Sequence, residues 1–291
     1  MNIKLSITQG KLTPQDELSE NYWLEEFEKI KKLENITRFS GNKYKTNSIT
    51  HIEWIVTKQN FDNNPLFDGI VLKNHPISAV NAEIMIDKNF YKKEFLEENL
   101  KPILKACKKN KIQCVNIPLK EFSNIQNVVI RKEFIKNIKV LGKAYLDIIF
   151  CFEFECEPED ILELVRGVKN FRLTYDTATI TSFKNNKQTH KMFISKLYKH
   201  IYNVRLRDKA LRGKPSNNQF GSGDVDFSEI ITNLLFIHKY KGNFIMSPMK
   251  CEKNMELATA AEELKFFVNL ISRLEKRFVT DYNKQQEVVM V

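Results

Sequence analysis

The sequence predicts an α/β fold, a single-domain (β/α)8 barrel (a TIM barrel) that spans residues 1–291. Eight short apolar segments of strand character alternate strictly with segments of helical character, which indicates parallel βαβ units. No proline- or glycine-rich linker divides the chain. No GxGxxG motif follows the first strand, as a dinucleotide-binding sheet would require. Eight such units over 291 residues therefore favour a closed barrel over an open sheet.

The predicted strands are short and mostly apolar, as the interior of such a fold requires. The fifth one, DIIFCF, is a continuous apolar run that is typical of a strand buried on both faces. The first, IKLSITQ, alternates and ends at Gln9. In chain order the predicted strands are 3–9, 51–56, 78–86, 112–119, 147–152, 171–175, 201–207 and 243–246.

Helices are predicted between these strands from apolar residues at helical spacing and from capping signals. Glu157-Pro158-Glu159-Asp160 places a proline and acids in a first turn, and Asp226 is typical of an N-cap. The predicted helices are 15–33, 93–109, 124–141, 157–168, 188–200, 226–239 and 256–277, with another starting near Asn64-Pro65-Leu66. We expect residues 256–291 to close the barrel or to contact a partner, because the tail ends in the apolar VVMV and could form a homodimer contact.

Composition excludes several classes of protein. A hydrophobic content of 42% and a charged content of 28% are ordinary for a globular protein. No segment approaches the roughly 20 apolar residues of a membrane span, and the start lacks a signal peptide, so we expect a cytoplasmic protein without a membrane partner. The five cysteines form no CxxC pair, which favours free thiols.

The net charge of +10 raises the question of nucleic-acid binding. The lysines are spread along the whole chain, and no nucleic-acid motif is present. We therefore do not expect nucleic acid as the natural partner. The charge suits an anionic small molecule equally well.

In a barrel of this kind, residues at the carboxyl ends of the strands share one site. Glu153 and Asp176 directly follow apolar runs, so each carboxylate either points into the site or serves as a cap or salt-bridge partner. Gly221-Ser222-Gly223 could present N–H groups to an anion or form a plain turn. The strand-end residues are Gln9, Glu53, Asp87, Asn116 with Lys120, Glu153, Asp176, Arg205 with Asp208, and Ser247 with Lys250.

A series of short segments spans nearly the whole chain in a characteristic order: TQGKLTP, HIEW with NNPL, VNIPL, FEFECEPEDIL, LTYDTA, VRLRDK, GSGDVDF and YKGNFIM. In this order they resemble the sugar phosphate isomerase/epimerase family of xylose-isomerase-like TIM barrels, in particular members encoded with surface-glycan and nonulosonic-acid-type pathways. The resemblance implies a small-molecule sugar or sugar-phosphate substrate.

The resemblance further implies one divalent metal (Mn, Co, Zn or Mg) held by Glu, Asp, His and Glu or Gln from strands five to eight, with carboxylates that move a proton. Glu153 and Asp176 match the first two ligand positions, and Thr179 matches the last residue of the DTGH or DTGN pattern. The His position is Arg205 and the final position is Ser247. An arginine has no lone pair to donate, so the metal itself is in question.

Two functions remain open at this point. The first is an isomerase- or epimerase-like enzyme with Glu153, Asp176 and Arg205 as catalytic residues. Its substrate would be bound by Gln9, Glu53, Asp87, Asn116, Asp208, Ser247 and Lys250. The second is a non-catalytic member of the same barrel family that binds a sugar or a partner protein. Lys120, Arg207, Lys209 and Lys214 could hold a phosphate or a carboxylate, or could be solvated charges.

Overall fold

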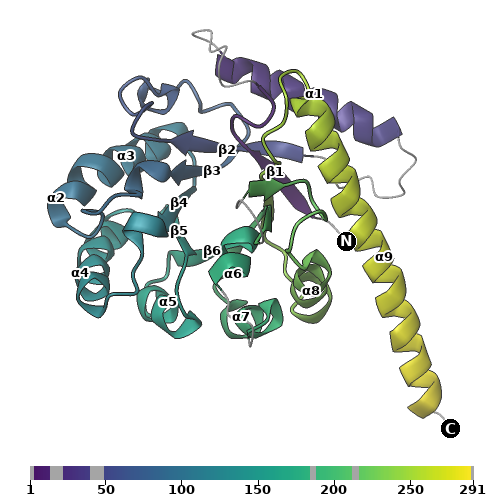
Figure 1. The fold of residues 1–291 in the computed structure, drawn as a ribbon. Helices are drawn as coiled ribbons and strands as arrows, with labels where there is room; N and C mark the ends of the chain where they lie inside the picture. Colours follow the sequence, from purple (N-terminus) through teal and green to yellow (C-terminus); the bar gives the residue numbers. More distant parts are fainter. Residues whose placement is uncertain (1–2, 14–21, 40–48, 184–187, 212–215, 290–291) are drawn as a thin grey trace.

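Eight parallel strands close into one barrel, which confirms the predicted fold class (Figure 1). The structure is a computed structural model and describes residues 3–13, 22–39, 49–183, 188–211 and 216–289. Each strand pairs with its neighbours in chain order, and β10 closes the ring against β1. The strands are β1 (Lys4–Thr8), β2 (Ile49–Val56), β3 (Ile77–Ala82), β4 (Cys114–Leu119), β5 (Ile149–Phe154), β6 (Phe171–Asp176), β7 (Ile201–Leu206) and β10 (Asn243–Met246).

Helices surround this barrel, and the last of them runs well past it to the C-terminal end (Figure 1). Among the described residues, no helix is long and apolar enough to cross a membrane. The α-helices are α1 (Tyr22–Phe39), α2 (Lys93–Phe95), α3 (Lys101–Asn110), α4 (Val128–Ala144), α5 (Pro158–Val165), α6 (Thr177–Phe183), α7 (His190–Leu197), α8 (Phe227–Ile231) and α9 (Glu256–Val289). Single 3₁₀ turns are η1 (Pro65–Phe67), η2 (Glu83–Met85) and η4 (Glu121–Ser123), and π-helical turns are η3 (Leu96–Leu100) and η5 (Thr232–Ile237).

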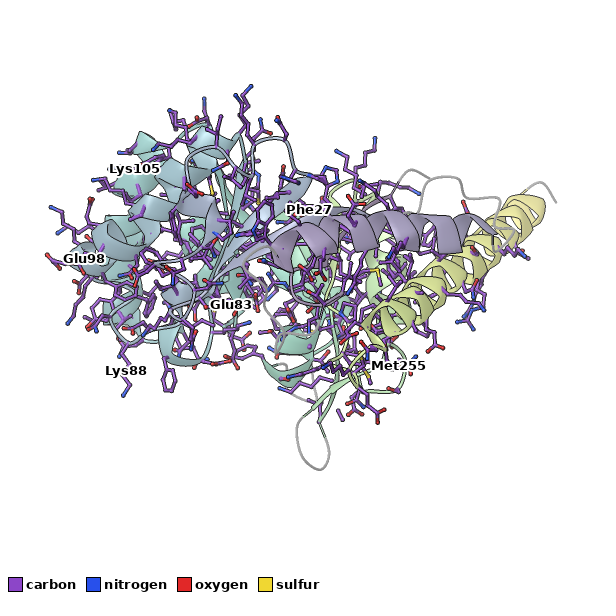
Figure 2. All side chains as sticks on the ribbon, turned by 90° about the horizontal axis from the view of Figure 1, so that it is seen from above. Phe27, Glu83, Lys88, Glu98, Lys105 and Met255 are labelled. Carbon is purple, nitrogen blue, oxygen red and sulfur yellow. The ribbon has the colours of Figure 1, made fainter. Side chains whose placement is uncertain are left out.

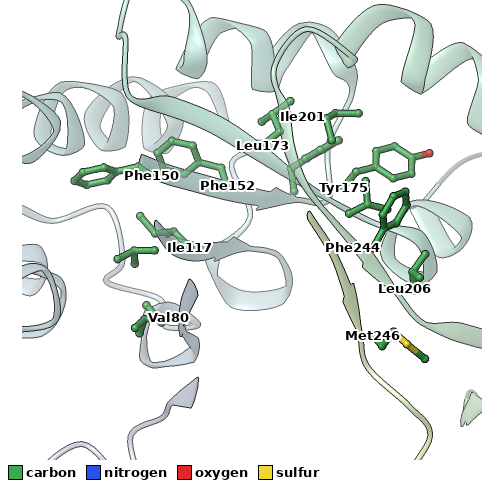
Figure 3. Close-up of a cluster of buried hydrophobic side chains, with 14 of the residues drawn as sticks. Val80, Ile117, Phe150, Phe152, Leu173, Tyr175, Ile201, Leu206, Phe244 and Met246 are labelled. Atoms are coloured by element: carbon green, nitrogen blue, oxygen red, sulfur yellow. The ribbon is translucent and has the colours of Figure 1, made fainter. Parts of the chain in front are cut away.

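The outer faces of the strands carry the hydrophobic core. Phe150, Phe152, Leu173 and Tyr175 are fully buried in one continuous cluster, part of which appears in Figure 3. Phe152 meets Phe134 of α4 with 6.2 Å between ring centroids, so this face of β5 packs against the helices. Because side chains alternate along a strand, the residues between these apolar ones point into the barrel.

The amino-terminal half of the barrel interior is filled with small side chains. Ala79, Cys114 and Cys151 form a separate buried cluster. The sulfur atoms of Cys114 and Cys151 lie 3.5 Å apart. All five cysteines are free thiols, in agreement with the prediction.

Several predicted element boundaries were wrong, and four of the differences bear on the site or on the ends of the fold. The third strand ends at Ala82 and not at 86, because Glu83–Met85 turns as 3₁₀ helix and buries Met85. The helix predicted near Pro65 is one 3₁₀ turn. The fifth strand extends to Phe154, paired with Leu119, so Glu153 lies inside it. The last helix continues to Val289, well beyond 277.

Three elements were not predicted: α6 and the two strands of a short hairpin. α6 begins directly at the end of β6. The predicted helix 188–200 is present as the shorter α7. A short hairpin of β8 (Asp208–Ala210) and β9 (Ser216–Asn218) follows β7. The predicted helix 15–33 lies partly outside the described residues, and α1 continues to Phe39.

Candidate functional site

Polar side chains fill the interior at the carboxyl ends of the strands, a region that we call the mouth. Strand register places them at matching heights, since Thr8 aligns with Glu53 on β2. Asp176 of β6 likewise aligns with Arg205 of β7. Side chains from β2, β4, β5 and β7, which are not all neighbours, bond to one another, so they meet across the barrel interior.

Arg205 lies at the centre of the mouth. Its guanidinium donates to Glu53 through Nη2 and to Glu153 through Nη1. Its Nη1 also lies 3.9 Å from Oδ2 of Asp176. Burial alone would lower the pKa of Arg205, but these three carboxylates hold that pKa above its ordinary value. Arg205 is therefore a permanent cation among three buried anions.

Two further cations cover the same carboxylates from the solvent side. Lys120 Nζ donates to Glu153 Oε1 at 2.6 Å. Arg207 binds Asp176 through two bonds, Nε to Oδ2 at 2.8 Å and Nη2 to Oδ1 at 3.0 Å. The cluster thus pairs three carboxylates with three cations, and only the side chains of Lys120 and Arg207 are appreciably exposed, at 14% and 23%.

The protonation state of Glu153 follows from this pairing. Burial would raise its pKa, but Lys120, Arg205 and Arg207 outweigh burial and hold that pKa well below the ordinary range. The side chain is also only 1% exposed. A carboxylate of low pKa that is already saturated with donors is a poor proton acceptor.

Neutral groups hold the inner carboxylates in position. Asn116 donates its amide to Glu53, and its own oxygen accepts from Thr174 at 2.7 Å and from Asn203 at 3.0 Å. Thr8 Oγ1 donates to Glu53 Oε2 at 3.1 Å. Asn116 and Glu53, predicted to bind substrate, are thus engaged with the protein in this structure.

Glu83 was not among the predicted strand-end residues, because the third strand was predicted to continue to residue 86. In the structure β3 ends at Ala82, and Glu83 is the first residue of η2. Its Oε1 accepts from Asn81 Nδ2 at 3.2 Å. Among the described residues it forms no ion pair, and its side chain is partly exposed. Burial raises the pKa of Glu83, against the opposing charges of Lys120 and Arg205. Its carboxyl group therefore lies close enough to Lys120 for the two charges to interact.

Lys11 and Glu263 complete the rim between β1 and β10. Glu26 of α1 fixes the loop that carries Lys11, because its Oε1 accepts from the N–H groups of Gly10 at 2.7 Å and Leu12 at 3.3 Å. Burial and the nearby Arg207 lower the pKa of Lys11. Glu263 accepts from Met249 N at 3.3 Å, and burial raises its pKa to about 7.

The loop after β7 binds an anion through its glycine amides, but that anion is the protein's own Asp208. Asp208 Oδ2 accepts from the N–H groups of Gly221 at 2.7 Å and Gly223 at 3.0 Å. A Cβ on Gly223 would lie 2.3 Å from Asp208 Oδ1, so this approach requires glycine. Asp208, predicted to bind substrate, here organises the loop.

The other predicted substrate-binding residues follow the strands at the same end of the barrel. Gln9 Oε1 accepts from Ile55 N at 2.8 Å, which ties β1 to β2. Asp87 pairs with Lys58 beyond η2, and that hydrogen bond lowers the pKa of Asp87. Ser247 is buried directly after β10, and Lys250 is exposed. Lys214 lies outside the described residues.

The mouth does not provide a suitable donor set for the divalent metal that the resemblance implies. Glu153 and Asp176 could serve as oxygen ligands, but Arg205 occupies the space between them with N–H groups that have no lone pair. Among the described residues, no group of three or more His, Cys, Asp or Glu side chains is placed to hold a metal ion.

No protein-family model and no curated protein matches this sequence. Solved structures match its fold. D-psicose 3-epimerase with D-tagatose, from Clostridium cellulolyticum H10, aligns over 92% of this chain and 99% of its own with 13% identity and a TM-score of 0.64. The IOLI protein with a bound zinc atom aligns over 96% of this chain and 99% of its own, with 15% identity and a TM-score of 0.56.

A xylose isomerase-like TIM barrel protein from Mycobacterium smegmatis in complex with magnesium aligns over 94% of this chain and 97% of its own, with 13% identity and a TM-score of 0.58. The structural neighbours of the present chain are thus xylose isomerase-like barrels that include sugar epimerases, and some of these neighbours bind zinc or magnesium. At these identities the likeness shows the fold alone.

Proposed function

We propose that this chain is a sugar isomerase- or epimerase-like enzyme that moves a proton on a carbon next to a sugar carbonyl, without a metal at the Arg205 position. The observation that carries the proposal is Glu83, a partly exposed carboxylate that forms no ion pair among the described residues and lies close enough to Lys120 for the two charges to interact. An acid/base group beside a fixed cation is the minimum that such proton transfer requires.

In the proposed reaction, Glu83 takes the proton from the carbon next to the carbonyl, and the C–H electrons move into the C=C bond of an enediolate. The carbonyl oxygen gains the negative charge, which Lys120 stabilises. An isomerisation is completed when Glu83 returns the proton to the former carbonyl carbon and the hydroxyl proton of the adjacent carbon moves to the former carbonyl oxygen, which leaves the new C=O on that adjacent carbon. An epimerisation is completed when a second donor protonates the original carbon on its opposite face, the C=O re-forms at its first position, and Glu83 keeps the abstracted proton.

Glu153 and Asp176 have a different role in this proposal from the one that the family pattern implies. They are buried at 1% or less and hold Arg205, Lys120 and Arg207 in place. Arg205 is only 4% exposed, so it acts through Glu153 on Lys120 and not on the substrate. The low pKa of Glu153 supports this assignment.

The alternative is a non-catalytic barrel that binds a sugar or a partner. It is favoured by the same saturated cluster, because every carboxylate that the family pattern would use is already neutralised by a cation. The two functions differ in whether a carbon-bound proton of a bound sugar ever exchanges with solvent.

The test is hydrogen exchange in D2O with chelator-treated protein and a panel of ketoses, aldoses, their phosphates and uronic acids. Proton NMR should reveal loss of the signal next to the carbonyl of one panel member. Glu83→Gln should abolish this exchange and Glu83→Asp should reduce it. Glu98→Gln, at an exposed position on the outer helices (Figure 2), should leave it unchanged. Exchange that survives Glu83→Gln would overturn the role of Glu83, and no exchange with any sugar would favour the non-catalytic alternative.

A further inference from the structure

We infer that Lys11 and Arg207 form a subsite for an oxyanion carried by the substrate, a phosphate monoester or a carboxylate, at the β1–β7 side of the mouth. This inference rests on the proposed function only in assigning the anion to a substrate. The binding itself follows from two fixed cations with unused hydrogen-bond donors.

In the described part of the chain, both side chains keep hydrogen-bond donors that no protein group accepts. Arg207 binds Asp176 and Thr179 through Nε and Nη2. In the part of the chain that the structure describes, its Nη1 has no protein partner, and the side chain is 23% exposed. Lys11 forms no hydrogen bond or ion pair with any described residue, although it is only partly exposed.

Both cations are fixed in position by the fold. Thr177 holds the backbone of Arg207, because its Oγ1 accepts from Arg207 N at 2.9 Å and donates to Arg207 O at 2.6 Å. The loop of Lys11 is fixed by the buried Glu26, which also accepts from Thr13 Oγ1 at 3.1 Å. Such positioning before binding reduces the ordering that an anion would otherwise impose.

The local charges favour an anion between the two side chains. Strand β10 pairs with both β1 and β7, so the loops that carry Lys11 and Arg207 follow strands that lie two positions apart at the same end of the barrel. Burial and the positive charge of Arg207 also lower the pKa of Lys11. The nearby acids Glu83 and Glu263 also influence Lys11, but neither lies within ion-pair distance of it in the described chain. A bound oxyanion would supply the missing charge and accept from both cations.

Lys120 provides a third group within reach. Lys120 Nζ and Arg207 Nη2 both lie near Glu153 Oε1, at 2.6 and 3.9 Å, so at most 6.5 Å separates the two nitrogens. A sugar whose anionic group rests on Arg207 is therefore within reach of Lys120. The anion subsite and the proposed proton-transfer pair form two ends of one site.

The experiment measures binding, so it does not depend on turnover. The full chain is titrated with inorganic phosphate, ribose 5-phosphate, glucuronate and ribose in low-salt buffer by calorimetry. Ribose 5-phosphate or glucuronate should bind more tightly than ribose and more tightly than inorganic phosphate. Lys11→Gln should lower the affinity for that charged sugar at least about tenfold, and Lys11→Arg should retain most of the affinity. Lys105→Gln, an exposed lysine on α3 at the periphery in Figure 2, is the matched control and should have no effect.

Equal affinities of Lys11→Gln and Lys105→Gln for the anions would overturn the subsite. Inorganic phosphate that binds as tightly as every charged sugar would overturn its assignment to a substrate. Anion binding through Lys11 without any hydrogen exchange would leave the subsite standing and remove the proposed catalysis. Hydrogen exchange on neutral sugars only, without anion binding, would support the proposed catalysis and overturn the subsite.

Discussion

The guanidinium of Arg205 and the carboxylate of Glu153 form an ion pair inside the barrel, with side-chain exposures of 4% and 1%. The family resemblance assigns the first metal-ligand position to Glu153 and the third to Arg205, with Asp176 between them in the chain. In this structure a protein cation of fixed charge, and not a ligand with a lone pair, therefore faces the Glu153 carboxylate. The stability and the ion-binding properties of the mouth follow from this pair.

Replacement of Arg205 by Met should strongly destabilise the fold. It would leave Glu53, Glu153 and Asp176 buried with fewer partners, and removal of one member of a buried ion pair typically lowers the free energy of unfolding by about 3–5 kcal/mol. Urea denaturation at pH 7 measures the loss. Adding Glu53→Gln and Glu153→Gln to Arg205→Met should recover part of it. A stability equal to that of the exposed-site control Lys105→Met would contradict the buried network.

Replacement of Arg205 by His should create a metal site. An imidazole there would offer a lone pair beside Glu153 and Asp176, which are oxygen ligands of the type that divalent metals bind. Calorimetry with Mn²⁺, Co²⁺ and Zn²⁺ should show saturable binding by Arg205→His that neither the parent chain nor Arg205→Met shows. Stoichiometric binding of the same ion by the parent chain, at the mouth, would contradict the assignment of Arg205.

Glu263 should make stability depend on pH near neutrality. Its pKa rises from the ordinary 4.5 to about 7 in the folded chain, because burial penalises the carboxylate. The folded state then holds the proton more tightly, so stability present below pH 4.5 is lost as pH rises through about 7. Glu263→Gln removes this loss and should raise the free energy of unfolding at pH 8 by roughly 1–3 kcal/mol relative to the parent.

The comparison should be made at pH 5 and pH 8, because the gain from Glu263→Gln is expected to shrink at the lower pH. The neighbouring exposed Glu262 provides the control, and Glu262→Gln should show no such difference. The same gain at both pH values would indicate that packing, and not the titration of Glu263, is responsible.

Asp208 should determine the order of the loop after β9. Its carboxylate accepts from the N–H groups of Gly221, Gly223 and Val225 in that loop and also from Lys209 N, so Asp208→Ala would leave the three loop donors without their acceptor. We expect a loss of roughly 2 kcal/mol in stability and faster amide exchange at these three residues. Asp208→Asn keeps one acceptor oxygen and should be intermediate. Unchanged amide exchange in Asp208→Ala would show that the loop is held by other contacts.

The alternation of apolar strands and amphipathic helices was enough to predict the barrel, because this pattern reports which faces are buried. It also placed Glu153, Asp176 and Arg205 at one end of the barrel, since the carboxyl ends of parallel strands share an edge. The pattern could not locate Glu83, because a strand that turns into a 3₁₀ helix has no distinct periodicity in so short a segment.

The sequence by itself therefore determined the fold class, the free cysteines and the end of the barrel that carries the polar residues. Only the tertiary structure decided which charges are paired. Arg205 binds Glu53, which is 152 residues away in the sequence, and Glu153, which is 52 residues away. Asp208 accepts from Gly221 in a loop that follows it in the chain. Such pairings depend on strand register and barrel closure, which bring distant residues within 4 Å and which no local pattern in the chain encodes.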